Sequence, residues 1–244
     1  MAKDKYKRKA EKSARSFLRT IGRGASPGSS ILVVTEGENT EPIYFEGIRK
    51  VFASSAIELV PYGAGRGDPR TLTEAAIRYR NKRRKQARNK ELSISQLEDF
   101  DQIWIVFDTD VLTPERRDQG IAYAESKGVK VASSEPCFEY WLLLHSAEYY
   151  TTAPMPKCDD VKPYLKKAFG WLGYDKNKSQ SQKLILPLVT KSNVAEAVRA
   201  AARVRKHHEA VDTPFPANPS TDVDLLINAI NEAVAIANKV AASR

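Results

Sequence analysis

The sequence predicts an α/β protein whose mostly parallel β-sheet is flanked by helices, with further helices toward the C-terminus. Short apolar segments alternate with helix-like segments between residues 30 and 150, a pattern typical of parallel sheets. The run IWIVF at residues 103–107 is continuously apolar, so we expect this strand to be buried on both faces by covering helices. Acidic residues follow three of the predicted strands, at the end of the sheet where α/β proteins place their active sites.

The individual elements follow from apolar spacing and from residues that begin or end helices. We expect strands within residues 30–37, 56–63, 101–110 and 129–134. Pro42 and Pro69 suit the first turn of a helix and Gly128 suits a helix end. The helices between and after the strands are therefore expected within residues 41–54, 69–90, 114–128 and 135–150.

The remaining residues predict a division into three regions. A basic, flexible arm at residues 1–28 ends in the linker-like GRGASPGSS. An α/β core follows at residues 29–150, and a helical lobe at residues 151–244 is expected to pack on that core. Within the lobe, residues 151–190 look irregular, and helices are expected at residues 192–211 and after a Pro-rich turn that begins at residue 214.

The net charge of +9 is concentrated in two basic blocks. Residues 1–23 carry nine lysines and arginines against two acids, and residues 78–90 carry eight basic residues and no acid. Both blocks could be solvated surfaces that only aid solubility, but two blocks of one sign favour a polyanion, RNA or DNA. The contacts expected from the second block are Arg78, Arg80, Lys82, Arg83, Arg84, Lys85 and Arg88.

Several features predict a cytoplasmic protein with no membrane partner. No stretch reaches the roughly 18 consecutive apolar residues of a membrane helix, and the basic N-terminus lacks the apolar centre of a secretion signal. Cys137 and Cys158 are 21 positions apart, without a CxxC pattern or a Cys/His cluster. We therefore expect neither a zinc site nor a disulfide, as in a reducing compartment.

Carboxylates gather after three predicted strands: Glu36, Glu38 and Glu41; Asp108 and Asp110; Glu135 and Glu139. Asp108 and Asp110 are two positions apart on an extended strand, so they point to the same side and repel unless a cation or a proton lies between them. Oxygen ligands without nearby His or Cys favour Mg²⁺ or Mn²⁺. Each acid could also be an ordinary residue of a loop, helix start or strand end. Glu38 is expected to be a solvated loop residue with no part in the site.

The turn EGENTE and the later DTD resemble the Toprim domain, the Mg²⁺-binding α/β module of topoisomerases, primases and OLD-type nucleases. The wider segments VVTEGENTEPIYFEG, FDTD, SSEPCFEYWLLLH and ANPSTDVDLLI resemble the RloB-like family of restriction- and defence-associated proteins. The resemblance implies a Toprim-like Rossmannoid fold, dependence on a divalent metal and a role in antiviral defence. It also implies catalytic roles for Glu36, Asp108 and Asp110, with Glu41 and Glu139 as further metal ligands.

The expected function is a Mg²⁺- or Mn²⁺-dependent nuclease that hydrolyses RNA, tRNA among its candidates, or DNA by a two-metal mechanism. Arg66 and Arg70, near the glycine-rich GAGRGDPR, are candidates to contact the scissile phosphate. Two alternatives stay open. One is nucleotidyl transfer, and the other is an inactive Toprim-like protein that binds nucleic acid or a nucleotide and regulates a companion defence protein.

Overall fold

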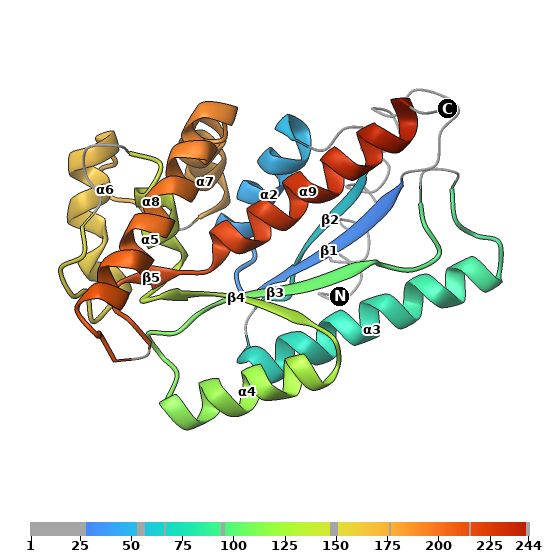
Figure 1. Cartoon of the computed structure of the whole chain (residues 1–244), viewed down its shortest axis with the longest axis horizontal. Coiled ribbons are helices and arrows are strands. Elements are labelled where there is room, and N and C mark those ends of the chain that lie inside the picture. Colours follow the sequence, from blue (N-terminus) through green and yellow to red (C-terminus); the bar gives the residue numbers. More distant parts are fainter. Residues whose placement is uncertain are drawn as a thin grey trace.

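The computed structural model describes residues 28–242 except 53–56, 66, 94–95, 147–150, 176 and 215, so the predicted basic arm lies almost wholly outside the described residues. Five strands form one sheet in the order β2-β1-β3-β4-β5 (Figure 1). They are β1 (Ser29–Thr35), β2 (Ile57–Gly63), β3 (Gln102–Asp108), β4 (Lys130–Glu135) and β5 (Ser220–Thr221). The first four run parallel and β5 is antiparallel to β4. The mostly parallel sheet confirms the predicted α/β class.

Helices cover both faces of this sheet (Figure 1). One face carries α2 (Thr40–Val51) and α9 (Val223–Ala242), and the other carries α3 (Pro69–Arg88) and α4 (Pro114–Ser126). Side chains alternate along β1, so Ile31 and Val33 enter the larger buried cluster. Their neighbours Leu32 and Val34 enter a second cluster on the opposite face. Burial on both faces explains why the strands are continuously apolar.

The remaining helices lie past the carboxyl ends of the parallel strands, at the left of Figure 1. They are α5 (Phe138–Leu143), η1 (Cys158–Asp160), α6 (Lys162–Phe169), α7 (Lys178–Ile185), η2 (Leu186–Leu188) and α8 (Lys191–Ala210). Two short α-helices thus occupy residues 151–190, which we had expected to be irregular. Each has local signals: Gly170 ends α6 in the left-handed conformation, and the Asn177 side chain caps α7.

The C-terminal third is not a separate packing unit. β5 pairs with β4, and α9 packs against β4, β1 and β2. One cluster of buried residues runs from Ile31 to Ala237 and so includes both sides of the boundary predicted at residue 150. The last helix, α9, therefore completes the cover of one face of the sheet. Helices α6, α7 and α8 lie past the carboxyl ends of its parallel strands (Figure 1).

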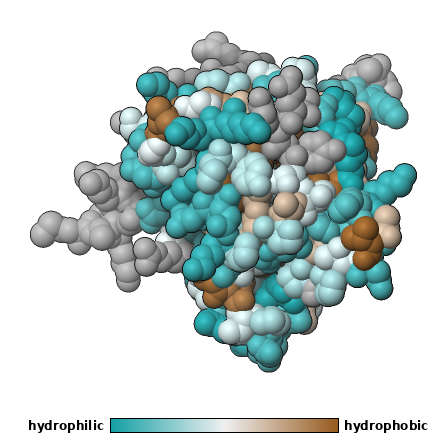
Figure 2. Space-filling model, turned by 90° about the vertical axis from the view of Figure 1, so that its left-hand side faces the viewer, coloured by the Kyte–Doolittle hydropathy of each residue, from teal (hydrophilic) through white to brown (hydrophobic). Residues whose placement is uncertain are grey.

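The surface is mainly polar on the face where α6 and α8 lie. Figure 2 shows this face as largely hydrophilic, with hydrophobic residues scattered over it, which is ordinary for a protein surface. Among the described residues, no helix combines the length and the apolar character that crossing a bilayer requires.

Candidate functional site

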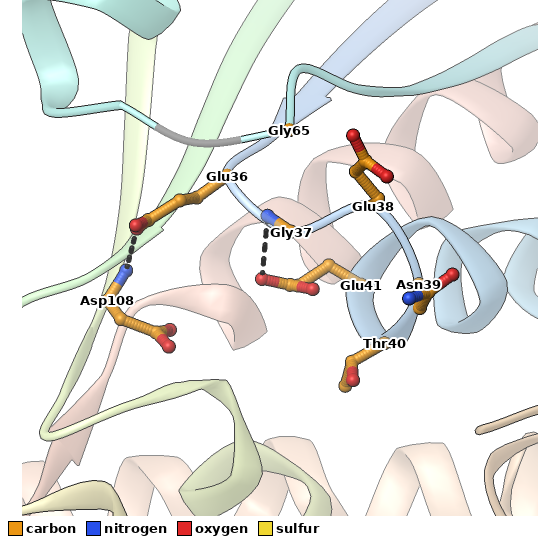
Figure 3. Close-up of a pocket in the computed structure, with 8 residues that line it drawn as sticks. All are labelled: Glu36, Gly37, Glu38, Asn39, Thr40, Glu41, Gly65 and Asp108. Atoms are coloured by element: carbon orange, nitrogen blue, oxygen red, sulfur yellow. Dashed lines mark hydrogen bonds between the residues drawn. The ribbon is translucent and has the colours of Figure 1, made fainter. Parts of the chain in front are cut away.

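A cleft of about 420 Å³ opens at the carboxyl ends of β1 and β3 (Figure 3). Its lining comes from the turn after β1, the start of α2, the loop after β2 and the end of β3. The lining residues are Glu36, Gly37, Glu38, Asn39, Thr40, Glu41, Gly65 and Asp108. Four of these side chains are carboxylates, and no lysine or arginine is among the described residues that line the cleft.

Parallel pairing of β1 with β3 brings Glu36 and Asp108 together although they are 72 positions apart. Thr35 is in register with Val106, and the Glu36 N–H donates to the Val106 carbonyl at 2.9 Å, so Glu36 extends the ladder past the last residue of β1. The Asp108 N–H in turn donates to Oε2 of Glu36 at 3.2 Å (Figure 3). Two of the predicted catalytic carboxylates therefore face one cleft.

Two glycines leave room for the other two carboxylates of the cleft. The Gly37 N–H donates to Oε1 of Glu41 at 3.2 Å, and a Cβ at Gly37 would lie 2.2 Å from Oε2 of Glu41. Gly65 has a φ of +93°, and a Cβ there would lie 2.6 Å from Oε1 of Glu38. Glu38 is exposed, as expected of a loop residue, but its carboxylate also lines the cleft. Its position inside a turn that already held two candidate ligands was the signal that could have identified it.

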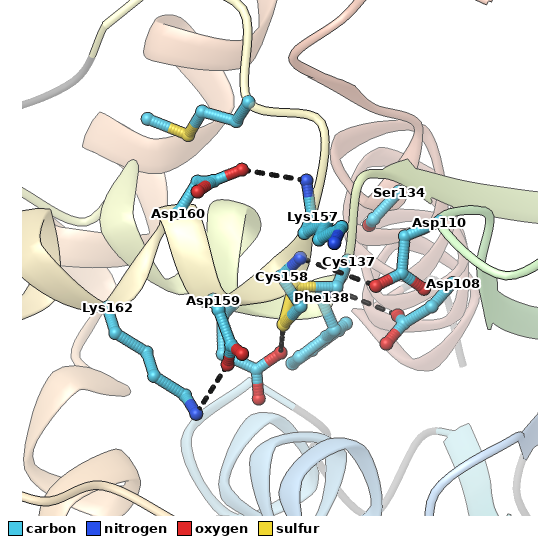
Figure 4. The surroundings of a disulfide bond; sticks show 12 residues. Asp108, Asp110, Ser134, Cys137, Phe138, Lys157, Cys158, Asp159, Asp160 and Lys162 are labelled. Atoms are coloured by element: carbon cyan, nitrogen blue, oxygen red, sulfur yellow. Dashed lines mark hydrogen bonds and ion pairs between the residues drawn. A yellow bond between two sulfur atoms is a disulfide. The ribbon is translucent and has the colours of Figure 1, made fainter.

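The other two predicted ligands lie beside the cysteines instead. Asp108 Oδ1 accepts a hydrogen bond from the Phe138 N–H at 2.8 Å, while Asp110 Oδ2 accepts one from the Cys158 N–H at 3.3 Å. Figure 4 shows both aspartates next to the cysteine pair. Glu139 is fully buried in α5, with Oε2 3.2 Å from Cys158 Sγ and Oε1 3.4 Å from the Tyr174 hydroxyl.

The cysteines themselves are joined in a disulfide, so the expectation that the chain has no disulfide was wrong. Cys137 precedes α5, and Cys158 begins η1. Their Cα atoms lie 5.5 Å apart because both segments pack at the carboxyl edge of the sheet. A separation of 21 residues in the chain gives no local signal of this contact.

The donors in the cleft suit a hard divalent cation in chemistry but do not form a closed ligand set. Carboxylate, amide and hydroxyl oxygens are the ligands that Mg²⁺ and Mn²⁺ prefer. Among the residues that the structure describes, however, one set of three side chains has its ligand atoms all within 4.8 Å of one another, and it is Cys137, Glu139 and Cys158. Glu36, Asp108 and Asp110 therefore do not form such a three-ligand set among the described residues, and the Asp110 side chain instead accepts a hydrogen bond from the Cys158 N–H.

The basic residues of α3 do not flank the cleft. The helix begins after β2, at the carboxyl edge of the sheet, and runs back to the opposite edge (Figure 1). At a rise of 1.5 Å per residue, Arg78 and Arg88 lie about 14 and 28 Å along the axis from Pro69. The basic block therefore extends from the middle of α3 to the end of the sheet that is remote from the carboxylates (Figure 1).

Arg83 is a structural residue rather than an exposed contact. Its side chain is 4 % exposed and forms a two-pronged ion pair with Glu58, with Nη1 2.9 Å from Oε2 and Nη2 2.8 Å from Oε1. The expected role of Arg83 in nucleic-acid contact is thus wrong, because a helix turns one side of any basic run toward the core. The exposed members of the block are Arg78, Lys82, Arg84, Lys85 and Arg88, and Arg80 is half-buried.

The two arginines expected to contact the scissile phosphate are Arg66 and Arg70. Arg70 is exposed in the first turn of α3, where its guanidinium lies 4.7 Å from the Tyr123 ring centre and its Nε 3.8 Å from Glu74. It does not line the cleft. Arg66 lies outside the described residues.

Comparison with known protein families gives a match over most of the chain. A family model described as RloB-like protein matches residues 31–230, which include the cleft, the cysteine pair and the beginning of α9. No curated protein and no solved structure matches the chain.

Proposed function

The chain belongs to the RloB-like protein family, and from this premise we propose that it is a divalent-metal-dependent phosphodiesterase. Its substrate would be RNA or DNA, and it would act in the cytoplasm in defence against phage. The observation that carries the proposal is that Glu36 and Asp108, from the ends of neighbouring parallel strands, face one cleft with two further carboxylates. Like charges gathered in this way repel one another, and a bound cation would reduce that repulsion.

The carboxylates of the cleft would bind the metal in this proposal, and backbone N–H groups would position them. Glu36, Glu41 and Asp108 would hold Mg²⁺ or Mn²⁺, and Glu38 would hold a solvated outer position. The bound metal would supply Lewis-acid polarisation of the phosphate and a water of lowered pKa. Gly37 positions Glu41 through its N–H, and the Phe138 N–H orients Asp108 by binding its Oδ1. These backbone donors hold the carboxylates in place before any ligand binds.

The distance between the cleft and the basic block bears on the substrate. A nucleic acid that reaches both must extend about 14–28 Å, or about 4–8 base pairs at 3.4 Å each. The basic residues would therefore bind the sugar–phosphate backbone away from the scissile bond and would contribute affinity without taking part in the reaction.

The test is cleavage of labelled tRNA and of plasmid DNA by the full chain with Mg²⁺, with Mn²⁺ or with EDTA. Asp108→Asn and Glu36→Gln should each reduce metal-dependent cleavage by about 100-fold, the usual size for loss of one electrostatic group at a reacting centre. Glu125→Gln, an exposed acid of α4, is the matched control and should cleave normally. Absence of metal-dependent cleavage of both substrates, or full activity in Asp108→Asn, would refute the proposal.

The same assay separates the alternatives. Incorporation of a labelled nucleotide without strand cleavage would assign nucleotidyl transfer. Binding of nucleic acid that is unchanged by metal and by both carboxylate variants would assign a regulatory protein that binds without reaction.

A further inference from the structure

Cys137, Glu139 and Cys158 form a cluster that the proposed phosphodiesterase does not use. Their two sulfurs and one carboxylate oxygen all lie within 4.8 Å of one another. Cys137 and Glu139 are fully buried, whereas Cys158 is partly exposed, which leaves a route from solvent to the sulfurs. The two cysteines of the cluster lie beside Asp108 and Asp110 (Figure 4).

The contact between Glu139 and Cys158 is not a hydrogen bond in the disulfide form. Oε2 of Glu139 lies 3.2 Å from Cys158 Sγ, the distance of a hydrogen bond to a thiol. A disulfide sulfur carries no hydrogen and cannot donate. A buried carboxylate beside two sulfurs is, however, the arrangement of a mixed sulfur and oxygen metal site.

We propose that, once the disulfide is reduced, Cys137, Glu139 and Cys158 bind one Zn²⁺ at a site separate from the acidic cleft. Tetrahedral coordination with Zn–S bonds of about 2.3 Å and a Zn–O bond of about 2.1 Å puts the ligand atoms roughly 3.6–3.8 Å apart. Oε2 and Cys158 Sγ are already 3.2 Å apart, and the Cα separation of 5.5 Å permits the sulfurs to part to that distance. The partly exposed side of Cys158 leaves the fourth position to water.

The sulfur chemistry selects zinc over the metals of the cleft. Thiolates bind Zn²⁺ strongly, whereas Mg²⁺ and Mn²⁺ prefer oxygen. Reduction breaks the S–S bond. A dithiol reductant transfers two electrons and two protons to the sulfurs of Cys137 and Cys158 and is itself oxidised to a disulfide. Zn²⁺ then displaces both thiol protons into the solvent as the thiolates bind it.

The site would also hold the two aspartates. The Phe138 N–H, next to Cys137, donates to Asp108, and the Cys158 N–H donates to Asp110. Either a disulfide or a zinc ion therefore ties together the two backbone segments that orient these carboxylates. Reduction without zinc would leave the η1 segment joined to α5 only by packing and hydrogen bonds.

The test measures zinc content, which is independent of whether the chain cleaves nucleic acid. The full chain is reduced with a dithiol, its free thiols are titrated, and after incubation with Zn²⁺ and desalting its zinc is measured by elemental analysis. We expect one Zn²⁺ per chain with two thiols, retained in excess Mg²⁺, and none in the oxidised chain. Reduced protein with two titratable thiols and no bound zinc would overturn the proposal.

Variants identify the ligands. Cys137→Ser/Cys158→Ser should bind no zinc, and Glu139→Gln should bind it at least ~10-fold more weakly, the lower limit for loss of even an outer-shell partner. Glu125→Gln is again the control. Co²⁺ bound to the reduced wild-type chain should give a thiolate charge-transfer band, which needs no variant that folds. Zinc retained by the double serine variant, or Co²⁺ without that band, would contradict the assignment.

Discussion

Replacing Arg83 with methionine should weaken the fold and leave nucleic-acid binding unchanged. Both Nη atoms of Arg83 bond to the Glu58 carboxylate, Nη1 also donates to the Leu97 carbonyl at 3.0 Å, and the guanidinium lies 4.7 Å from the Phe100 ring centre. The side chains of Arg83 and Glu58 are 4 % and 2 % exposed. Removing one of them therefore leaves the charge of the other buried, without its partner and without water.

The loss of unfolding free energy follows from that unpaired buried charge. Breaking a buried ion pair by removing one partner costs about 3–5 kcal/mol of unfolding free energy. For a chain of this size each kcal/mol corresponds to roughly 2–4 °C, so the melting temperature of Arg83→Met should fall by about 6–20 °C. The double variant Glu58→Leu/Arg83→Met should recover part of this loss. Recovery stays incomplete because Glu58 also accepts hydrogen bonds from the Ser30 hydroxyl and the Leu97 N–H.

Lys82→Met is the matched control, because Lys82 precedes Arg83 and is exposed. Its unfolding free energy should change by no more than about 0.5 kcal/mol. Its affinity for nucleic acid should fall, with the salt dependence reduced by about one charge. Melting is followed by circular dichroism, and binding is measured at several salt concentrations at a temperature where both variants are folded. If Arg83→Met melted normally but bound nucleic acid weakly, the assignment of Arg83 to the core would be refuted.

Three further predictions concern pH, the cleft and the disulfide. Burial lowers the pKa of His145 from 6.5 to about 4. Between these pH values the unfolded chain binds more protons than the folded chain, so the unfolding free energy falls as the pH drops. The total fall is on the order of 3 kcal/mol. Urea denaturation across this range should show a shallower fall in His145→Gln, and equal slopes would contradict the assignment. Gly37→Ala should displace the Glu41 carboxylate, lowering unfolding free energy by about 1.5–3 kcal/mol and raising the Mg²⁺ needed for cleavage about 10-fold. An unchanged Mg²⁺ titration would count against Glu41 as a ligand. Reduction in the presence of a chelator breaks the link between Cys137 and Cys158, which are 21 positions apart, and should lower unfolding free energy by about 3 kcal/mol. Calorimetry that detects no change on reduction would oppose a stabilising role for the link.

The sequence could predict part of the cleft because the main carboxylates of the cleft follow strands that the sequence predicts. Glu36 and Asp108 each come directly at the end of a buried apolar segment, and parallel strands present their carboxyl ends at one edge. The remote position of the basic block was also within reach of the sequence. A helix that begins at this edge must carry its last residues about 28 Å back toward the other edge.

The sequence by itself determined the α/β class and the buried strands, because apolar periodicity and turn residues act within a single element. It also determined the family match, which depends on the sequence alone. Tertiary structure alone decided the partners of side chains far apart in the chain. It diverted Asp110 to the Cys158 N–H and turned Arg83 toward Glu58. These contacts depend on the order of strands and on how the segments beyond the sheet pack against its edge. The spacing of residues along one helix or strand encodes neither the strand order nor this packing.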